Sequence, residues 1–88
     1  MTEKTAKVIN SLGIHARPSS LIVQTAIKFK SSVQLVKDGA SADAKSIMSV
    51  MMLAAAQDSN VVIRAEGEDE VEAVDAIFKL FELKFNEE

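Results

Sequence analysis

The only histidine and the only proline of the chain lie in one short segment, which holds the residue types best suited to chemistry. This segment reads Gly13-Ile14-His15-Ala16-Arg17-Pro18. Proline has a fixed φ near the helical value and no N–H group to donate, so it fits the first turn of a helix. Helix-forming and apolar residues follow from Leu21 to Phe29. We therefore expect Pro18 to mark a helix start, with His15 and Arg17 at or just before it.

A helix start at this place is suited to an anion. The first N–H groups of a helix have no intrahelical partner and carry partial positive charge. Arg17 adds a guanidinium group that matches phosphate oxygens, and Gly13 permits a close backbone approach. Neutral imidazole is available near neutral pH, because its unperturbed pKa is about 6.5. The pattern suits a transient phosphohistidine at His15. The alternative is that a lone histidine near a helix start is a surface or capping residue.

The histidine segment resembles the active-site signature of the HPr family, the histidine-containing phosphocarriers of the bacterial phosphoenolpyruvate:sugar phosphotransferase system. A second segment, Lys45-Ser46-Ile47-Met48, resembles the regulatory-serine region of the same family. The two segments are separated as they are in that family, and the resemblance covers essentially the whole chain, including its length. Two motifs at the right separation are more specific than either motif alone.

The resemblance implies a function. His15 would accept a phosphoryl group at Nδ1 from phosphorylated enzyme I and pass it to a histidine of an enzyme IIA domain, for sugar uptake. Arg17 would stabilise the group in transfer. The protein would be a carrier and not an enzyme, and no cofactor or metal is predicted. The residues that we expect to contact partners are Ala16, Arg17, Ser20, Gln24, Ile47, Met48 and Met51.

Ser46 is the predicted regulatory phosphoserine, although its position before a short apolar run also fits a simple N-cap. In many relatives a dedicated kinase phosphorylates the equivalent serine. The added charge at a helix start would oppose partner docking with little change of fold. That kinase and a transcriptional regulator are further expected partners. Ser49 stands where close relatives often have glycine, and Met52 and Ala54 replace smaller or more flexible residues.

Two other functions remain open from the sequence. One is a regulatory binding protein that acts through Ser46 and its neighbouring methionines, with little or no role in sugar transport. The other is a small autonomous enzyme, such as an acyl phosphatase on a comparable β-α-β-β-α-β scaffold. No second catalytic group is evident beside His15, which argues against the enzyme.

Composition limits the remaining choices. The 88 residues, 48% of them apolar, are enough for one domain spanning residues 1–88. The net charge of −3 disfavours a nucleic-acid binder. The lack of cysteine excludes disulfides and, with a single histidine, disfavours a zinc site. No apolar run approaches the roughly 20 residues that span a bilayer, and Met1–Lys4 lacks a signal-peptide core. We expect a cytoplasmic monomer without membrane insertion.

The residue pattern predicts the elements that position these groups. Alternating apolar residues predict strands at Thr5–Ile9, Ser31–Lys37 and Asn60–Glu66. The small and polar residues Ala40–Asp43 are expected to form a further short strand at a sheet edge. Asp38-Gly39 predicts a type I′ hairpin turn between the second and third strands. Helical spacing predicts helices over Ala16–Phe29, over Ile47 to about Leu53, and after Glu68.

Core and surface positions follow from the same spacing. The expected core residues of the helices are Ser19, Ile22, Val23, Ala26, Phe29, Val50, Leu53, Val71, Val74, Ile77, Phe78 and Phe81. Ile47, Met48 and Met51 are expected to be largely exposed, with the alternative that Met51 and Met52 fill core gaps. Asp69 and Glu72 resemble a capping box, and the Ala54–Ala56 run could extend the short helix.

The resulting order is β-α-β-β-α-β-α. Four strands with helices on one face predict an α+β fold, an open-faced β-sandwich with an antiparallel sheet. The resemblance implies that the strands lie side by side in the order first, fourth, second, third.

Overall fold

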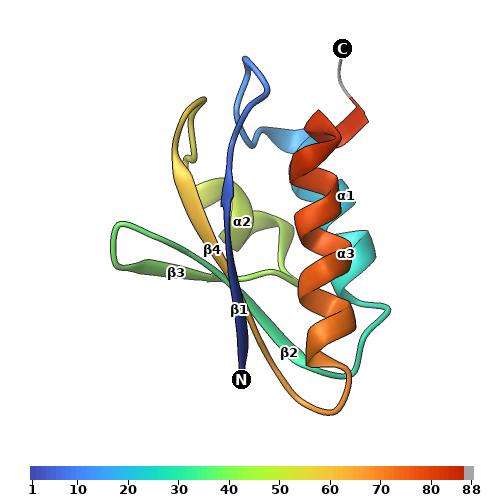
Figure 1. The fold of residues 1–88 in the computed structure, drawn as a ribbon. Helices are drawn as coiled ribbons and strands as arrows, with labels where there is room; N and C mark the ends of the chain where they lie inside the picture. The colour runs from blue at the N-terminus through green and yellow to red at the C-terminus, as the bar shows by residue number, and fades with distance from the viewer. Residues whose placement is uncertain (87–88) are drawn as a thin grey trace.

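The computed structural model describes residues 1–86, and its elements follow the predicted order (Figure 1). The strands are β1 (Thr2–Lys7), β2 (Ser32–Lys37), β3 (Ala40–Asp43) and β4 (Asn60–Glu66). The helices are α1 (Ala16–Ala26), α2 (Ile47–Met52) and α3 (Glu70–Glu82), followed by a 3₁₀ turn at Lys84–Asn86. Residues 87 and 88 of the predicted 1–88 domain lie outside the described residues.

The four strands form one antiparallel sheet in the order β1-β4-β2-β3, which confirms the order implied by the resemblance. Leu35 of β2 pairs with Ile63 of β4 on one side and Ala42 of β3 on the other. Because side chains alternate between the faces of a strand, this register places all three on the same buried face. The helices cover that face (Figure 1).

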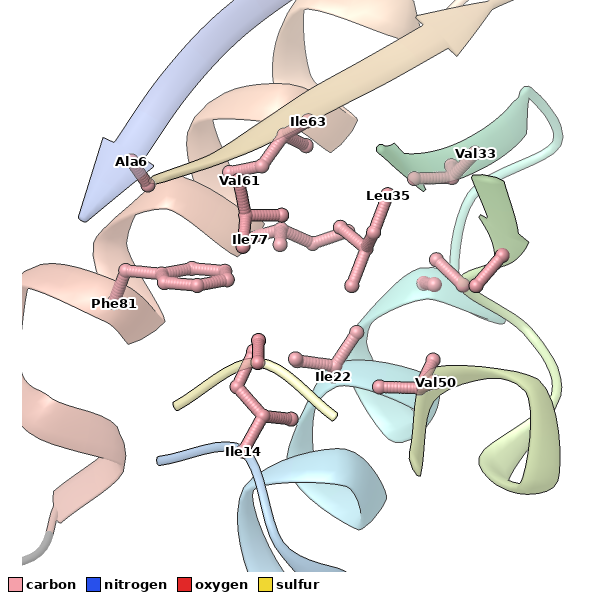
Figure 2. Close-up of a cluster of buried hydrophobic side chains, with 14 of the residues drawn as sticks. Ala6, Ile14, Ile22, Val33, Leu35, Val50, Val61, Ile63, Ile77 and Phe81 are labelled. Carbon is pink, nitrogen blue, oxygen red and sulfur yellow. The ribbon is translucent and has the colours of Figure 1, made fainter. Parts of the chain in front are cut away.

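The core lies between the buried face of the sheet and the helices. Ile22 and Ala26 of α1 and Val74, Ile77 and Phe81 of α3 are fully buried there. Figure 2 shows Ile22 of α1 beside Val50 of α2, with Ile77 and Phe81 of α3 toward β4. The apolar residues that recur with period 2 in the strands therefore pack against those that recur with period 3.6 in the helices, as the sequence predicts.

Several predicted boundaries differ from the structure. β1 spans Thr2–Lys7, not Thr5–Ile9, because pairing with β4 extends to Thr2 opposite Ala65. α1 ends at Ala26, and a turn follows in which Phe29 is only half-buried, as is Val23 within the helix. α2 is not extended by the alanine run, because Ala54 has a φ of 52° and turns the chain out of the helix.

The start of α3 also differs from the prediction. Val71 is 53% exposed, so it does not belong to the core stripe. Asp69 makes no side-chain hydrogen bond to its own helix, so the predicted capping box is absent. Its carboxylate instead accepts hydrogen bonds from the backbone N–H groups of Lys30 and Ser31, both at 2.9 Å, and from the Ser31 hydroxyl. It thereby ties α3 to the loop before β2.

The hairpin between β2 and β3 forms as predicted. Asp38 and Gly39 have φ values of 50° and 83°, the two positive angles that a type I′ turn requires.

Candidate functional site

His15 is the N-cap residue of α1, which begins at Ala16. Its backbone is extended, and its carbonyl accepts the N–H of Ser19 at 3.0 Å, the first hydrogen bond of the helix. Its side chain makes no capping hydrogen bond to α1. His15 therefore occupies the N-cap position, as the capping alternative expects, but it caps through its backbone and not through its side chain. The half-buried imidazole lies at the helix start.

The backbone leading to His15 is held from two sides. The N–H of Ile14 donates to the carbonyl of Ala55 at 2.9 Å, and the Asn10 side-chain amide donates to the carbonyl of Gly13 at 2.7 Å. Gly13 has a φ of 68°, and a Cβ there would lie 2.5 Å from the Ala55 carbonyl oxygen. The Ile14 side chain is directed into the core cluster (Figure 2). The loop thus fixes where α1 starts.

The first turn of α1 offers positive potential. It begins with Ala16 and Arg17, both exposed, and contains no acidic residue. Pro18 is the third helical residue, where the missing N–H disturbs no intrahelical hydrogen bond. The N–H groups at this end and the nearby guanidinium group together suit an anionic group.

The next turns of α1 carry the other predicted contact residues of this helix. Ser20 is half-buried and Gln24 is exposed, and the Gln24 amide donates to the Ser20 hydroxyl at 3.0 Å. Both lie outside the core cluster. They are therefore accessible side chains on the helix that His15 caps.

Ser46 is the N-cap of α2, as predicted. Its backbone is extended, and its hydroxyl oxygen accepts the N–H of Ser49 at 3.3 Å. The Ser46 side chain caps α2 and is half-buried, so it lies directly before the exposed residues of that helix.

One face of α2 is apolar and exposed, and we call it the methionine face. Ile47, Met48, Met51 and Met52 are 44%, 71%, 43% and 78% exposed, and they line an open pocket of about 430 Å³. Val50 and Leu53 are buried as predicted. The predicted exposure of Ile47, Met48 and Met51 is also confirmed. The alternative that Met51 and Met52 fill core gaps is wrong.

Met52 was not among the predicted contact residues. It follows Met48 by four positions, so helical spacing alone could have placed it on the same face.

The methionine face and the His15 loop are joined through the backbone. α2 packs against α1, and the segment after α2 supplies the Ala55 carbonyl that holds Ile14. The structure thus brings the two sequence motifs into neighbouring elements, although Ser46 begins the helix and Ala55 lies beyond its end.

The described residues offer no metal centre and no membrane span. Within residues 1–86, no group of three or more metal-binding side chains comes together. Every helix in the same range is too short or too polar to span a bilayer.

Comparisons with known proteins agree with this geometry. The family model described as PTS HPr component phosphorylation site matches residues 2–82. Phosphocarrier protein HPr of Treponema pallidum (strain Nichols) is 50% identical over 88 residues, covering 100% of both chains. A crystal structure of HPr-C-His from Thermoanaerobacter tengcongensis superposes with a TM-score of 0.95 at 48% identity, covering 100% of this chain and 99% of that one. A crystal structure of an HPr dimer from the same organism has a TM-score of 0.79 at 47% identity, covering 99% and 100% of the two chains. This chain therefore belongs to the PTS-HPr family of phosphocarrier proteins.

Proposed function

We propose that the protein accepts a phosphoryl group on His15 from phosphorylated enzyme I and passes it to enzyme IIA domains for sugar uptake. The observation that carries this proposal is the place of His15. The half-buried imidazole stands at the start of α1, beside a first turn that carries Arg17 and no acidic residue. Membership in a phosphocarrier family supports the same chemistry.

The transfer follows from this arrangement. The Nδ1 lone pair of neutral His15 attacks phosphorus, a new N–P bond forms, and the N–P bond to the donor histidine breaks. Handing the group to enzyme IIA is the same exchange in reverse. Negative charge on the three phosphoryl oxygens is stabilised by N–H groups at the start of α1 and by Arg17. The chain's own contribution is positioning and charge stabilisation, with no cofactor in the proposed step.

Partners would dock over α1 and the methionine face. Ala16, Ser20 and Gln24 supply polar or small contacts from α1, and Ile47, Met48 and Met51 supply an adaptable apolar surface. Methionine side chains are flexible and polarizable, so one face can fit several partners. The proposed setting is the cytoplasm.

Ser46 is the proposed regulatory phosphorylation site, served by a dedicated kinase. A phosphoserine would place nearly two negative charges at the start of α2, where the helix tolerates them. The same charges would lie beside Ile47 and Met48 and disfavour docking of enzyme I. A transcriptional regulator that recognises the phosphoserine is a further proposed partner.

The Ser46 proposal is tested with Ser46→Asp, and Ser49→Asp serves as the matched control. We expect Ser46→Asp to lower kcat/KM of enzyme I for this protein by about tenfold, because charge opposes docking at the same face. Ser49→Asp tests whether any charge on this helix has the same effect. Unchanged kinetics for Ser46→Asp would sink the regulatory proposal.

The carrier proposal is tested by intact-mass measurement after incubation with enzyme I, Mg²⁺ and phosphoenolpyruvate. We expect one acid-labile phosphoryl group on the wild type and none on His15→Ala. No phosphorylation with several enzyme I sources would overturn the carrier function. It would favour the regulatory binding protein, because Ser46 and its apolar neighbours would remain an accessible site.

A further inference from the structure

All the sulfur in the chain belongs to methionine, because the sequence has four methionines and no cysteine. Three of the four, Met48, Met51 and Met52, lie on the six-residue helix α2, and all three are exposed. The fourth, Met1, precedes β1, and its ammonium group pairs with Glu70 at 3.0 Å, at the start of α3. The oxidisable sulfur is therefore concentrated on one exposed face.

The surroundings of these thioethers leave them accessible. Within residues 1–86, they line an open pocket together with Ile47 alone, and the packing of α2 depends on Val50, which is fully buried. A small oxidant can therefore reach the sulfur atoms without opening the core. The added oxygen atoms would point to solvent in the free protein, so the fold can accept them.

We propose that Met48, Met51 and Met52 form an oxidation site through which hydrogen peroxide switches off partner docking. This inference rests on the proposed carrier function. With hydrogen peroxide, a sulfur lone pair attacks one peroxide oxygen, the O–O bond breaks, and water leaves. Sulfur is oxidised by two electrons to the sulfoxide, and the peroxide is reduced. Two thiols of a methionine sulfoxide reductase reverse the change, giving thioether, disulfide and water.

The effect on docking follows from the change in polarity. A thioether is apolar and adaptable, whereas a sulfoxide carries a strong hydrogen-bond acceptor and a fixed configuration. Burying that oxygen against an apolar partner surface leaves an unsatisfied polar group, which is costly. Up to three such groups would lie on a helix that packs against α1 and whose following segment contacts the His15 loop.

The test compares each protein with itself before and after a limited dose of hydrogen peroxide. Peptide mass mapping locates the sulfoxides, and circular dichroism checks the fold. The kinetics of phosphoryl transfer from enzyme I are then measured with the peroxide removed. The matched variant is the triple replacement Met48→Leu, Met51→Leu and Met52→Leu, which keeps Met1 as the remaining oxidisable sulfur. Leucine has a similar volume and no sulfur.

In the wild type we expect sulfoxides on α2, an unchanged circular dichroism spectrum and a KM for transfer that rises about tenfold, because polar groups are buried on docking. Treatment with the reductase should restore the original KM. In the leucine variant, the ratio of KM values after and before peroxide should stay near one, even with Met1 oxidised.

Four results would overturn the inference. The first two are unreacted α2 methionines and unchanged transfer by wild type with sulfoxides mapped to α2. The other two are an equal loss in the leucine variant and a loss of fold on oxidation. Failure of the unoxidised wild type to accept any phosphoryl group is a different result, because it refutes the carrier function itself and the inference with it.

Discussion

At the scale of single residues, the loop before His15 depends on the absence of a side chain at Gly13. The backbone φ of 68° strains any residue that has a Cβ, and a Cβ at this position would also clash with the Ala55 carbonyl oxygen at 2.5 Å. Gly39 offers a matched control, because its φ is 83° while nothing lies within 4 Å of a Cβ built there. The pair separates the cost of the backbone angle from the cost of the close contact.

We expect Gly13→Ala to lower the free energy of unfolding by about 3 kcal/mol and Gly39→Ala by about 1 kcal/mol. Both variants pay for a left-handed backbone angle, but only the first must also move the Ala55 carbonyl. Urea denaturation followed by circular dichroism measures both. Equal losses for the two variants would show that the contact with Ala55 has no energetic weight.

The candidate site residues could be proposed from sequence, but the contacts that hold them in place could not be predicted from it. His15, Arg17 and Pro18 reveal a helix start through residue chemistry alone. The Ala55 carbonyl that holds Ile14 lies 2.9 Å from its N–H yet far along the chain, and backbone contacts of this kind leave no trace in residue type. Residue type alone lets the alanine run either extend the short helix or lead out of it into a turn, and it does not reveal Ala55 as a partner of the His15 loop.

At the scale of elements, α2 is a helix of six residues and needs its N-cap. We expect Ser46→Ala to cost about 1 kcal/mol of folding free energy, because the Ser49 N–H loses its acceptor. Ser49→Ala is the control, since Ser49 supplies only its backbone N–H to this cap. Thermal unfolding of the two variants under the same conditions measures the difference. A Ser49→Ala loss as large as that of Ser46→Ala would contradict the cap.

The junction between α3 and the loop before β2 predicts a pH dependence. The Ser31 hydroxyl, the Lys30 N–H and the Ser31 N–H lower the pKa of Asp69 from 3.8 to about 2. A carboxyl whose pKa is lowered by folding stabilises the protein above its unfolded pKa, and that stability is lost as pH falls through the folded pKa. We expect Asp69→Asn to be less stable than wild type at pH 7, with the gap closing between about pH 4 and pH 2.

Thermal midpoints measured across this pH range test the Asp69 contact. Ser31→Ala removes one of the three donors, so it should show a smaller gap to wild type than Asp69→Asn does. If the difference in thermal midpoint between wild type and Asp69→Asn does not change with pH, the stability that the variant loses is not due to the charge of Asp69.

The same junction shows why the element ends were harder to predict than the elements. Asp69 followed by Glu72 has the local spacing of a capping box, but tertiary donors in the loop before β2 compete for the carboxylate. Glu70 instead reaches back to the Gly67 N–H at 3.1 Å and to the Thr2 hydroxyl at 2.7 Å, which lower its pKa to about 2. The helical spacing of apolar residues predicts where α3 lies. The contacts of its first residues depend on hydrogen bonds to distant parts of the chain, which the spacing does not reveal.

At the scale of the whole molecule, the oligomeric state stays a prediction. A carrier that must present His15 and α2 to several partners is expected to act as a monomer. A solved relative 47% identical to this chain is nevertheless described as an HPr dimer. Light scattering after size exclusion, across a range of protein concentrations, should give the mass of one chain throughout. A stable species of twice that mass would contradict the prediction.

The sequence predicts the type and order of the elements better than it predicts their pairing, and the reason is physical. Alternation in β2 and β4 and helical spacing in α3 reflect burial, which the residue types record directly. Strand order does not follow from burial, and it came from the resemblance. Exposure on α2 could be inferred because a two-turn helix cannot bury four large apolar side chains besides Val50 and Leu53.

The β2–β3 hairpin has a practical consequence for watching this protein at work. Its turn projects away from α1 and α3 (Figure 1), and Ala40 beside it is exposed with an ordinary backbone angle. Since the natural chain has no thiol, Ala40→Cys would provide a single attachment point for a fluorophore. The anisotropy of that dye would then report each encounter with a partner, from a hairpin that carries none of the proposed contact residues.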